Sequence, residues 1–471
     1  VQADRQIVEG ETAQAVATLQ AGLSRWPGAP ELRAQLARAQ LLGDRVEESA
    51  RTLGEPRADD PASIWLARGA LARRQGDAPG TLGAYGRATQ LAPQDDRGWF
   101  GLGSAHTERE DSGPARSNLL RALELHPTGP GYRGELGTLE TYRNKLADAD
   151  AAFAAALADN PGDYVALTGL GLLRLKQGDA QAALDAFLRA GVMEPRYARA
   201  KTYTAVAYYQ LGRHQDAIAT LQQAAALDDK DPVPHLFLAQ VYTDLFRAGD
   251  AVAASRAGVQ RLPYLKSLNQ LANDQQGRAN FGAALAFFGM EDWALELAQQ
   301  AYLPYWGGSH LFLADRYPGE FNKNSELFQG FLADPLAFGA SPLFSSLLQR
   351  PGMHGAVSMT GEKEFYRLSS PAFTLNGLQN VPFPVAFFVK GQKAIASRLP
   401  IDVGVSGLAA LYDPTGRADA RASVATLGLG ARPIDRLGLF AYYNDTDIRI
   451  HGRNRIDLFG GDTISSEIDN N

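Results

Sequence analysis

Two consecutive segments share one pattern of residues: 130–163, PGYRGELGTLETYRNKLADADAAFAAALADNPGD, and 164–197, YVALTGLGLLRLKQGDAQAALDAFLRAGVMEPRY. They are offset by 164 − 130 = 34 residues. Proline recurs at this step, at Pro93, Pro127, Pro161 and Pro195. Glycine recurs at Gly69, Gly103, Gly137 and Gly171, and Ala205 and Ala239 continue that column. Two more columns of small residues are Thr81, Ala115, Ala149, Ala183, Ala217, Ala251 and Ala88, Ala122, Ala156, Ala190, Ala224, Gly258. The pattern indicates one structural unit repeated along the chain.

A period of this length with these small residues is the signature of tetratricopeptide helical repeats. Each unit is expected to be two antiparallel helices, with small residues where they cross and a proline after the second helix, which cannot continue there. One unit cannot cover its own apolar face, so neighbours stack into a solenoid. The predicted units are 62–95, 96–129, 130–163, 164–197, 198–231 and 232–265, with a less regular unit at 29–61, part of another before it and a last one at 275–308. We expect the natural protein to extend upstream of Val1.

Composition narrows the class of protein. A chain of 471 residues is too long for one core, so two or more domains are expected. The chain has no cysteine, which excludes disulfides and thiolate metal sites and points toward the envelope of a Gram-negative bacterium. A net charge of −6 argues against nucleic acid as a partner. No apolar run approaches the ~18 residues of a transmembrane helix.

Helical periodicity ends near residue 303, and the domains are predicted as 1–308, 309–352 and 353–471. The middle segment is rich in aromatics, glycine and proline and is interpreted as a connector. Its aromatic rings are either core of the junction or a stacking site for sugars, and the sequence leaves both open.

Beyond Gly352 the hydrophobic period is two, which is typical of half-buried strands. The strand candidates are 353–360, 365–375, 382–391, 401–412, 421–432 and 436–450. Leu427, Leu429, Leu437 and Leu439 are predicted to face lipid, while the opposite face is small and polar, as in the lumen of a membrane barrel. We therefore predict the first part of an outer-membrane β-barrel that continues past Asn471 or pools strands from several copies. A soluble β-domain is the alternative.

No catalytic constellation stands out. The seven histidines are scattered, and no pair stands four apart on a helix to hold a metal. There is no thiol nucleophile, no Gly-x-Ser-x-Gly elbow and no phosphate-binding glycine loop. The Asp–Asp pairs at 59–60, 95–96 and 228–229 are interpreted as solvated turn or N-cap residues. The chain is thus predicted to be no enzyme, with no catalytic residue, metal or cofactor.

Binding is expected on the first helix of each unit, where late positions should face the concave groove of the solenoid. The candidates are Arg73, Arg74, Thr107, Glu108, Tyr142, Lys176, Tyr209, Gln210 and Asp244. Tyr142, Lys176 and Tyr209 are expected to lie on one continuous surface and to take no part in packing. The asparagine that repeats use to clamp a terminal carboxylate is missing at the ninth positions, so this mode of binding is not expected.

Helical repeats followed by a barrel resemble the exopolysaccharide export proteins of Gram-negative bacteria, of the cellulose-synthase C subunit and poly-N-acetylglucosamine porin types. The resemblance implies periplasmic repeats that dock enzymes and guide polymer into an outer-membrane barrel. It implies envelope proteins, polysaccharide and outer-membrane lipid as partners, and no nucleic acid. The alternatives are a scaffold of an envelope or surface-fibre assembly with a soluble β-domain, and a phage-adsorption type of outer-membrane protein.

Overall fold

The computed structural model describes residues 2–8, 10–109, 111–143, 145–261, 264, 352–363, 367–379, 383–400, 417–434, 437–457 and 463–470. The helices belong to one compact unit and the strands to another. Of the predicted connector at 309–352 only Gly352 is described, and the last repeat at 275–308 and the strand candidate 401–412 lie outside the described residues. The two predicted domain boundaries, at 308/309 and 352/353, therefore stay predictions.

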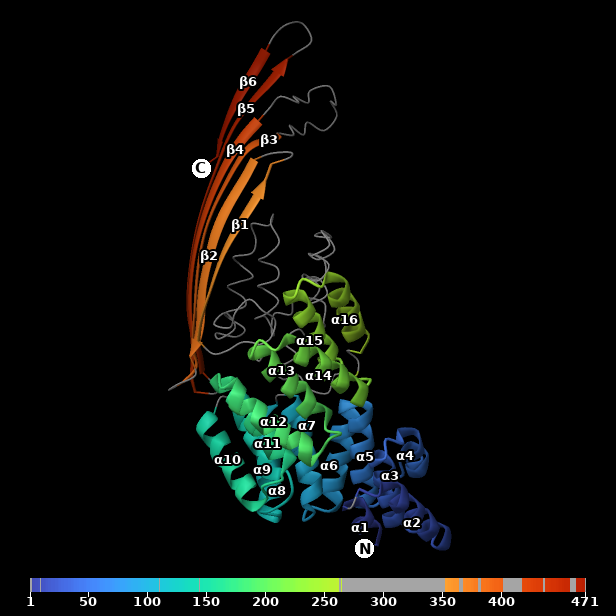
Figure 1. Cartoon of the computed structure of the whole chain (residues 1–471). Coiled ribbons are helices and arrows are strands. Elements are labelled where there is room, and N and C mark those ends of the chain that lie inside the picture. Colours follow the sequence, from blue (N-terminus) through green and yellow to red (C-terminus); the bar gives the residue numbers. More distant parts are fainter. Residues whose placement is uncertain are drawn as a thin grey trace. The chain divides into compact units, whose positions relative to one another are not determined.

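The described helices are α1 (Gln2–Val8), α2 (Thr12–Arg25), α3 (Pro30–Leu42), α4 (Val46–Leu53), α5 (Ala62–Gln75), α6 (Ala78–Leu91), α7 (Asp96–Glu108), α8 (Ser112–Leu125), α9 (Tyr132–Tyr142), α10 (Leu146–Asp159), α11 (Tyr164–Gln177), α12 (Ala180–Met193), α13 (Ala198–Gln210), α14 (His214–Leu227), α15 (Val233–Asp244) and α16 (Ala248–Arg261) (Figure 1). Each predicted unit from 62 to 265 contains one pair, which confirms the repeat boundaries. None of the helices in the described ranges combines the length and apolarity that crossing a membrane requires.

Local chemistry sets where the helices begin and end. Each predicted proline follows a second helix by two residues, as Pro195 follows Met193. Several first helices end at a glycine with positive φ, such as Gly178 after α11 (φ 85°), a conformation that side chains other than glycine rarely adopt. Aspartates begin other helices: Asp163 accepts hydrogen bonds from the backbone N–H groups of Val165 and Ala166, each 3.0 Å long.

The glycine column lies where the two helices of a unit cross. A methyl group added at Gly103 would sit 2.6 Å from Leu119 of α8, and one added at Gly137 would sit 2.5 Å from the ring of Phe153. The facing residue always follows the glycine by 16 positions, as 119 − 103 and 153 − 137 both show. Gly103 and Ala115, two of the small residues expected where helices cross, are both buried, and the closest neighbour of Gly103 is Leu119.

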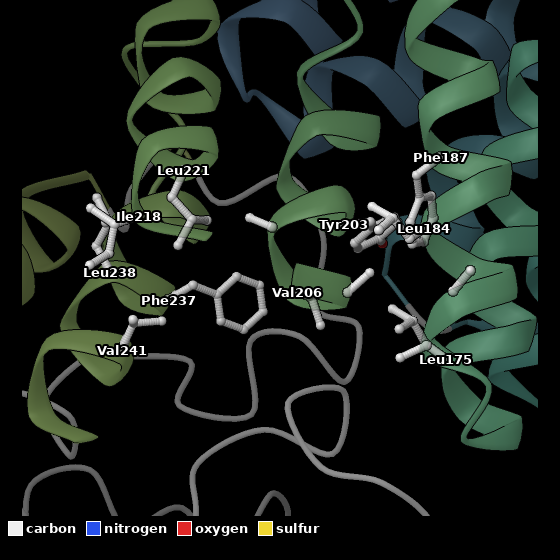
Figure 2. Close-up of a cluster of buried hydrophobic side chains, with 14 of the residues drawn as sticks. Leu175, Leu184, Phe187, Tyr203, Val206, Ile218, Leu221, Phe237, Leu238 and Val241 are labelled. Carbon is white, nitrogen blue, oxygen red and sulfur yellow. The ribbon is translucent and has the colours of Figure 1, made fainter. Parts of the chain in front are cut away.

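The largest apolar cluster of the described helices runs from α11 to α16. Figure 2 shows Phe187 and Tyr203 at one end and Phe237 and Val241 at the other. Phe187 is fully buried, with its ring centroid 5.7 Å from that of Tyr203. Because the cluster crosses repeat boundaries, neighbouring units stabilise one another as the stacking argument predicted.

The strands are β1 (Gly352–Glu362), β2 (Arg367–Gln379), β3 (Val385–Pro400), β4 (Arg417–Ile434), β5 (Leu437–Asp457) and β6 (Thr463–Asn470). They form one antiparallel sheet in sequence order (Figure 1). Five of the six candidates correspond to β1–β5, and β6 was not predicted. In the described strands, β1 and β6 are the two edges, so the sheet is open.

The two faces of the sheet differ in character. Register places Val357, Phe373, Leu375, Leu427 and Tyr443 on one face, and all five are exposed. The other face buries Ser370, Asn376, Phe388 and Thr426. There Gln392 donates to Ser370 over 3.0 Å and Thr426 to Asn444 over 2.8 Å. The outward face is thus the apolar one, and polar side chains bond to each other on the opposite face.

Candidate functional site

The first helices of successive units form one layer along the solenoid. From α3 to α15 each odd-numbered helix touches the next odd-numbered helix. This layer curves: Arg199 of α13 comes within 3.6 Å of Glu108 of α7, although α9 and α11 lie between them along the chain. We call the surface lined by α5, α7, α9, α11, α13 and α15 the concave face.

Two arginines and two glutamates from four different helices meet at the centre of the concave face. Arg73 donates to Oε1 of Glu108 from Nη2 over 2.5 Å and from Nε over 3.2 Å. Arg199 lies 3.6 Å from Glu108 and 3.8 Å from Glu135. The four side chains are neutral as a set, and the pair Arg73–Glu108 is the tightest contact within it.

Glu135 is the least satisfied member of this cluster. Its side chain is 8% exposed, and its carboxylate lies 3.8 Å from the guanidinium of Arg199, beyond hydrogen-bond distance. Burial raises the pKa of Glu135, while Arg199 and Arg73 act in the opposite direction. The pKa of Arg73 is raised by the charge of Glu108, so this arginine keeps its proton throughout the accessible pH range. The centre of the face therefore holds one tightly bonded pair, Arg73 and Glu108, and one loosely associated pair, Arg199 and Glu135.

Tyrosines surround the cluster. The hydroxyl groups of Tyr142 and Tyr203 lie 3.3 Å apart, again across α11. Tyr164 meets Tyr197 edge to face, with ring centroids 5.1 Å apart. Burial raises the pKa of Tyr197 to about 12, so its hydroxyl is a hydrogen-bond donor at neutral pH.

Tyr209 and Asp244, both predicted candidates, form a direct pair. The hydroxyl of Tyr209 donates to Asp244, which also accepts a 2.9 Å hydrogen bond from Nε2 of Gln240. Burial raises the pKa of Tyr209, and the charge of Asp244 raises it further. The structure therefore brings together these two residues, as it does Arg73 and Glu108.

Other candidates sit in the interior. Thr107 is 2% exposed and its hydroxyl donates to the carbonyl of Gly103 over 2.9 Å, while Lys176 and Gln210 are 8% and 7% exposed. Tyr142 and Tyr209 pack against the apolar cluster of α11–α16. The expectation that Tyr142, Lys176 and Tyr209 take no part in packing was therefore wrong. Late positions on the first helices thus contribute to the interior of the solenoid.

Among the aspartates at the junctions, Asp59 and Asp229 are exposed and Asp95 caps a helix, as interpreted, whereas Asp60 and Asp228 are buried. Asp95 begins α7, accepting a 3.1 Å bond from the N–H of Arg97. Asp60 is only 4% exposed and pairs with Arg33 (2.9 Å) and Arg68 (3.3 Å). Asp228 is 9% exposed and pairs with Arg74. Asp60 and Asp228 are thus interior ion-pair residues rather than solvated turn residues.

Sequence reasoning missed Arg199 and Glu135. Both lie in the first half of their helices, whereas the candidates were taken from late positions. A signal was available, since a charged residue inside an apolar first helix needs a partner. Which partner it meets depends on the curvature of the solenoid, and the 34-residue pattern does not specify that curvature.

The concave face can recognise a partner by charge and hydrogen bonding. Its carboxylates accept hydrogen bonds, its guanidinium groups donate them, and its tyrosines do both. Across the part of the chain that the structure describes, no group of three acidic, histidine or cysteine side chains could hold a metal ion.

Comparison with known proteins bears on the helical unit. Residues 7–73, 135–191 and 179–232 match models of the tetratricopeptide repeat. The helical unit is therefore a tetratricopeptide-repeat solenoid.

Cellulose synthase 2 operon protein C of Komagataeibacter xylinus is 30% identical over 200 residues, which are 41% of this chain and 15% of that protein. Cell division cycle protein 27 homolog B of Arabidopsis thaliana is 26% identical over 145 residues, which are 31% of this chain and 19% of that protein. The chain thus spans less than a fifth of the length of either relative. A solved structure of a human IFIT1 dimer with PPP-AAAA aligns with 71% of this chain and 88% of its own, at 14% identity and a TM-score of 0.48.

Proposed function

We propose that this chain is an outer-membrane export component whose tetratricopeptide repeats act in the periplasm as an adaptor for envelope proteins or a polar polymer. The observation that carries the proposal is the exposed apolar face of a sheet that follows a repeat solenoid in the same chain. Repeats of this family generally bind protein partners, which supports the adaptor role.

The apolar face has the dimensions of a membrane band. On β1 it runs from Met353 to Met359, which is seven residues or roughly 23 Å at ~3.3 Å per residue. The apolar band of outer-membrane barrels is about 25 Å tall. Beyond the level of Met359 the same face carries Arg421 and Arg449, which are register partners on β4 and β5, as expected where strands leave a bilayer. In a protein surrounded by water, an apolar face of this extent would favour aggregation.

The opposite face supports the same proposal. Gln392 bonds to Ser370 and Thr426 to Asn444 between neighbouring strands. Small and polar side chains on the inward face, alternating with apolar ones outward, are the pattern of a barrel lumen. The resemblance of the repeats to cellulose synthase 2 operon protein C is compatible with export of a polysaccharide, which we include in the proposal.

Flotation with phospholipid vesicles tests the membrane role. We expect the whole chain to float with the lipid, to need detergent when lipid is removed, and to migrate on gels in a heat-dependent way. Leu427→Arg should reduce the floating fraction, because arginine on the lipid face costs about 2–4 kcal/mol near mid-bilayer. Asp419→Arg is the matched control, because Asp419 lies on the same strand and face but past the level of Met359, where the band ends. It should float as the unmodified chain does.

The outcomes separate the candidate functions. A chain that stays monomeric in buffer without detergent and does not float is a scaffold with a soluble β-domain, and the export proposal then fails. A chain that floats, but whose loss leaves polymer export in the producing cell unchanged, keeps the membrane location and loses the export role.

A further inference from the structure

Arg74 joins two parts of the solenoid that are far apart in the sequence. Its Nη2 lies 2.6 Å from Asp44, in the turn before α4, and its Nη1 lies 3.3 Å from Asp228, at the end of α14. The separation of 228 − 74 = 154 residues exceeds four 34-residue steps. One guanidinium therefore connects two limbs of the superhelix that do not follow each other along the chain.

The contact between the limbs extends beyond this ion pair. A methyl group added at Gly76, two residues after Arg74, would lie 3.3 Å from the Cα of Tyr264. Nζ of Lys230 lies 5.4 Å from the ring centroid of Tyr264. Backbone, an aromatic ring and charges thus meet where the superhelix returns on itself.

The electrostatics of Asp228 explain why the bond to Arg74 forms. Asp228 caps the C-terminus of α14, where the helix dipole disfavours a negative charge. Its side chain is only 12% exposed, so water compensates little of that charge. Arg74 is 28% exposed and pairs with two carboxylates, and its contact with Asp228 (3.3 Å) is longer than its contact with Asp44 (2.6 Å). Salt and water can reach such a bond, so it can hold the limbs together and still be released.

At the centre of the concave face, the closed superhelix holds charged side chains without close hydrogen bonds between them. Arg199 reaches Glu108 and Glu135 across intervening helices at 3.6 and 3.8 Å, beyond the usual ~3.2 Å limit of a hydrogen bond. The side chain of Glu135 is 8% exposed, and its nearest cationic group, the guanidinium of Arg199, stays at 3.8 Å. A buried charge in this state is costly, and widening the face would let water or a partner satisfy it.

We propose that Arg74 is a clasp that holds the superhelix closed, and that its release widens the concave face and exposes Glu108, Glu135 and Arg199 to solvent. The clasp itself depends only on the contacts within the helical unit.

Distance measurement by double electron–electron resonance tests the clasp on the full chain in detergent. Because the chain has no cysteine, Glu47→Cys and Arg256→Cys create two unique label sites, both exposed, on α4 and α16. With Arg74 intact we expect one narrow distribution of distances. With Arg74→Ala we expect a broader distribution shifted to longer distances. Salt at ~1 M, where screening acts within about 3 Å, should shift the intact chain the same way and leave the variant unchanged.

Arg213→Ala is the matched control. It breaks a 2.7 Å ion pair with Asp216 at the start of α14 and removes the guanidinium from the ring of Tyr208, and all of these residues belong to one repeat. The distribution should not change. If Arg74→Ala fails to fold, as judged by circular dichroism, Asp228→Asn decides, since it keeps the shape and removes the charge.

An unchanged, narrow distribution in the variant that folds overturns the clasp. The result is independent of flotation: a chain that does not float can still show the clasp. A chain that floats without a clasp keeps its proposed membrane function.

Discussion

Substituting Gly137 by alanine tests the packing that makes this solenoid. Gly137 lies in the middle of α9, and its added methyl group would lie 2.5 Å from Cε1 and 2.8 Å from Cδ1 and Cζ of Phe153. Ordinary contacts of this kind begin near 3.4 Å, so the ring would have to move by about 1 Å. It cannot do so freely, because it is fully buried and Gly169 of α11 lies against it from the next unit.

Two effects of opposite sign set the magnitude. Overpacking a core costs ~1–3 kcal/mol, and a ring confined on both sides belongs near the upper end. Replacing glycine by alanine inside a helix contributes up to ~1 kcal/mol in the other direction. We therefore expect Gly137→Ala to lower the free energy of unfolding by about 2 kcal/mol. Urea titration followed by circular dichroism at 222 nm, which reports the helices, measures this difference.

Gly83→Ala is the matched control, because Gly83 lies inside α6, is exposed, and has no atom within 4 Å of the added methyl group. It should raise the free energy of unfolding by up to ~1 kcal/mol. In another repeat the chain itself combines the larger residue with a smaller partner: Ala205 stands in the glycine column, and the residue 16 positions later is Leu221 rather than an aromatic residue. Gly137→Ala combined with Phe153→Leu should therefore cost less than the two changes added together. Equal stability of the Gly137→Ala and Gly83→Ala variants would refute the assigned crossing.

Three further predictions concern the strands and the buried charges. Spin labels at Leu427 and Leu437 should be protected from water-soluble relaxants in bilayers, and strong accessibility at both would favour a soluble β-domain. Asp60→Asn should lower stability by about 3 kcal/mol at pH 7, because it leaves Arg33 and Arg68 without their buried partner. Burial acts to raise the pKa of Asp60, but the hydrogen bonds and charges of Arg57, Arg68 and Arg33 outweigh it and hold the pKa below its ordinary value of 3.8. The ionised carboxylate of Asp60 therefore stabilises the fold above that pH. This stabilisation is lost as the pH falls through the lower pKa of the folded protein. The difference between Asp60→Asn and the unmodified chain should accordingly shrink in acid titrations below about pH 4. Tyr209→Phe should cost about 1.5–3 kcal/mol by removing the hydroxyl that donates to Asp244, and an unchanged urea midpoint would contradict that bond.

The sequence by itself determined the local architecture. The 34-residue spacing of Gly103, Gly137 and Gly171 placed the helix crossings, because only a small side chain fits where two helices approach closely. The prolines placed the ends of the second helices, because proline cannot continue a helix. The period-two pattern placed β1 to β5 and assigned Leu427, Leu429, Leu437 and Leu439 to the outward face, because alternate side chains point to opposite faces of a sheet.

Only the tertiary structure decided which distant side chains meet. Arg73 and Glu108 were chosen from the sequence, but their bond, and the approach of Arg199 and Glu135, depend on how far the solenoid curves. Arg74 and Asp228 lie 154 residues apart and no periodic pattern relates them. A repeat fixes the contacts between neighbouring units, whereas the small rotation from each unit to the next accumulates along the solenoid. That sum determines the curvature, and with it the charge cluster at the centre of the concave face.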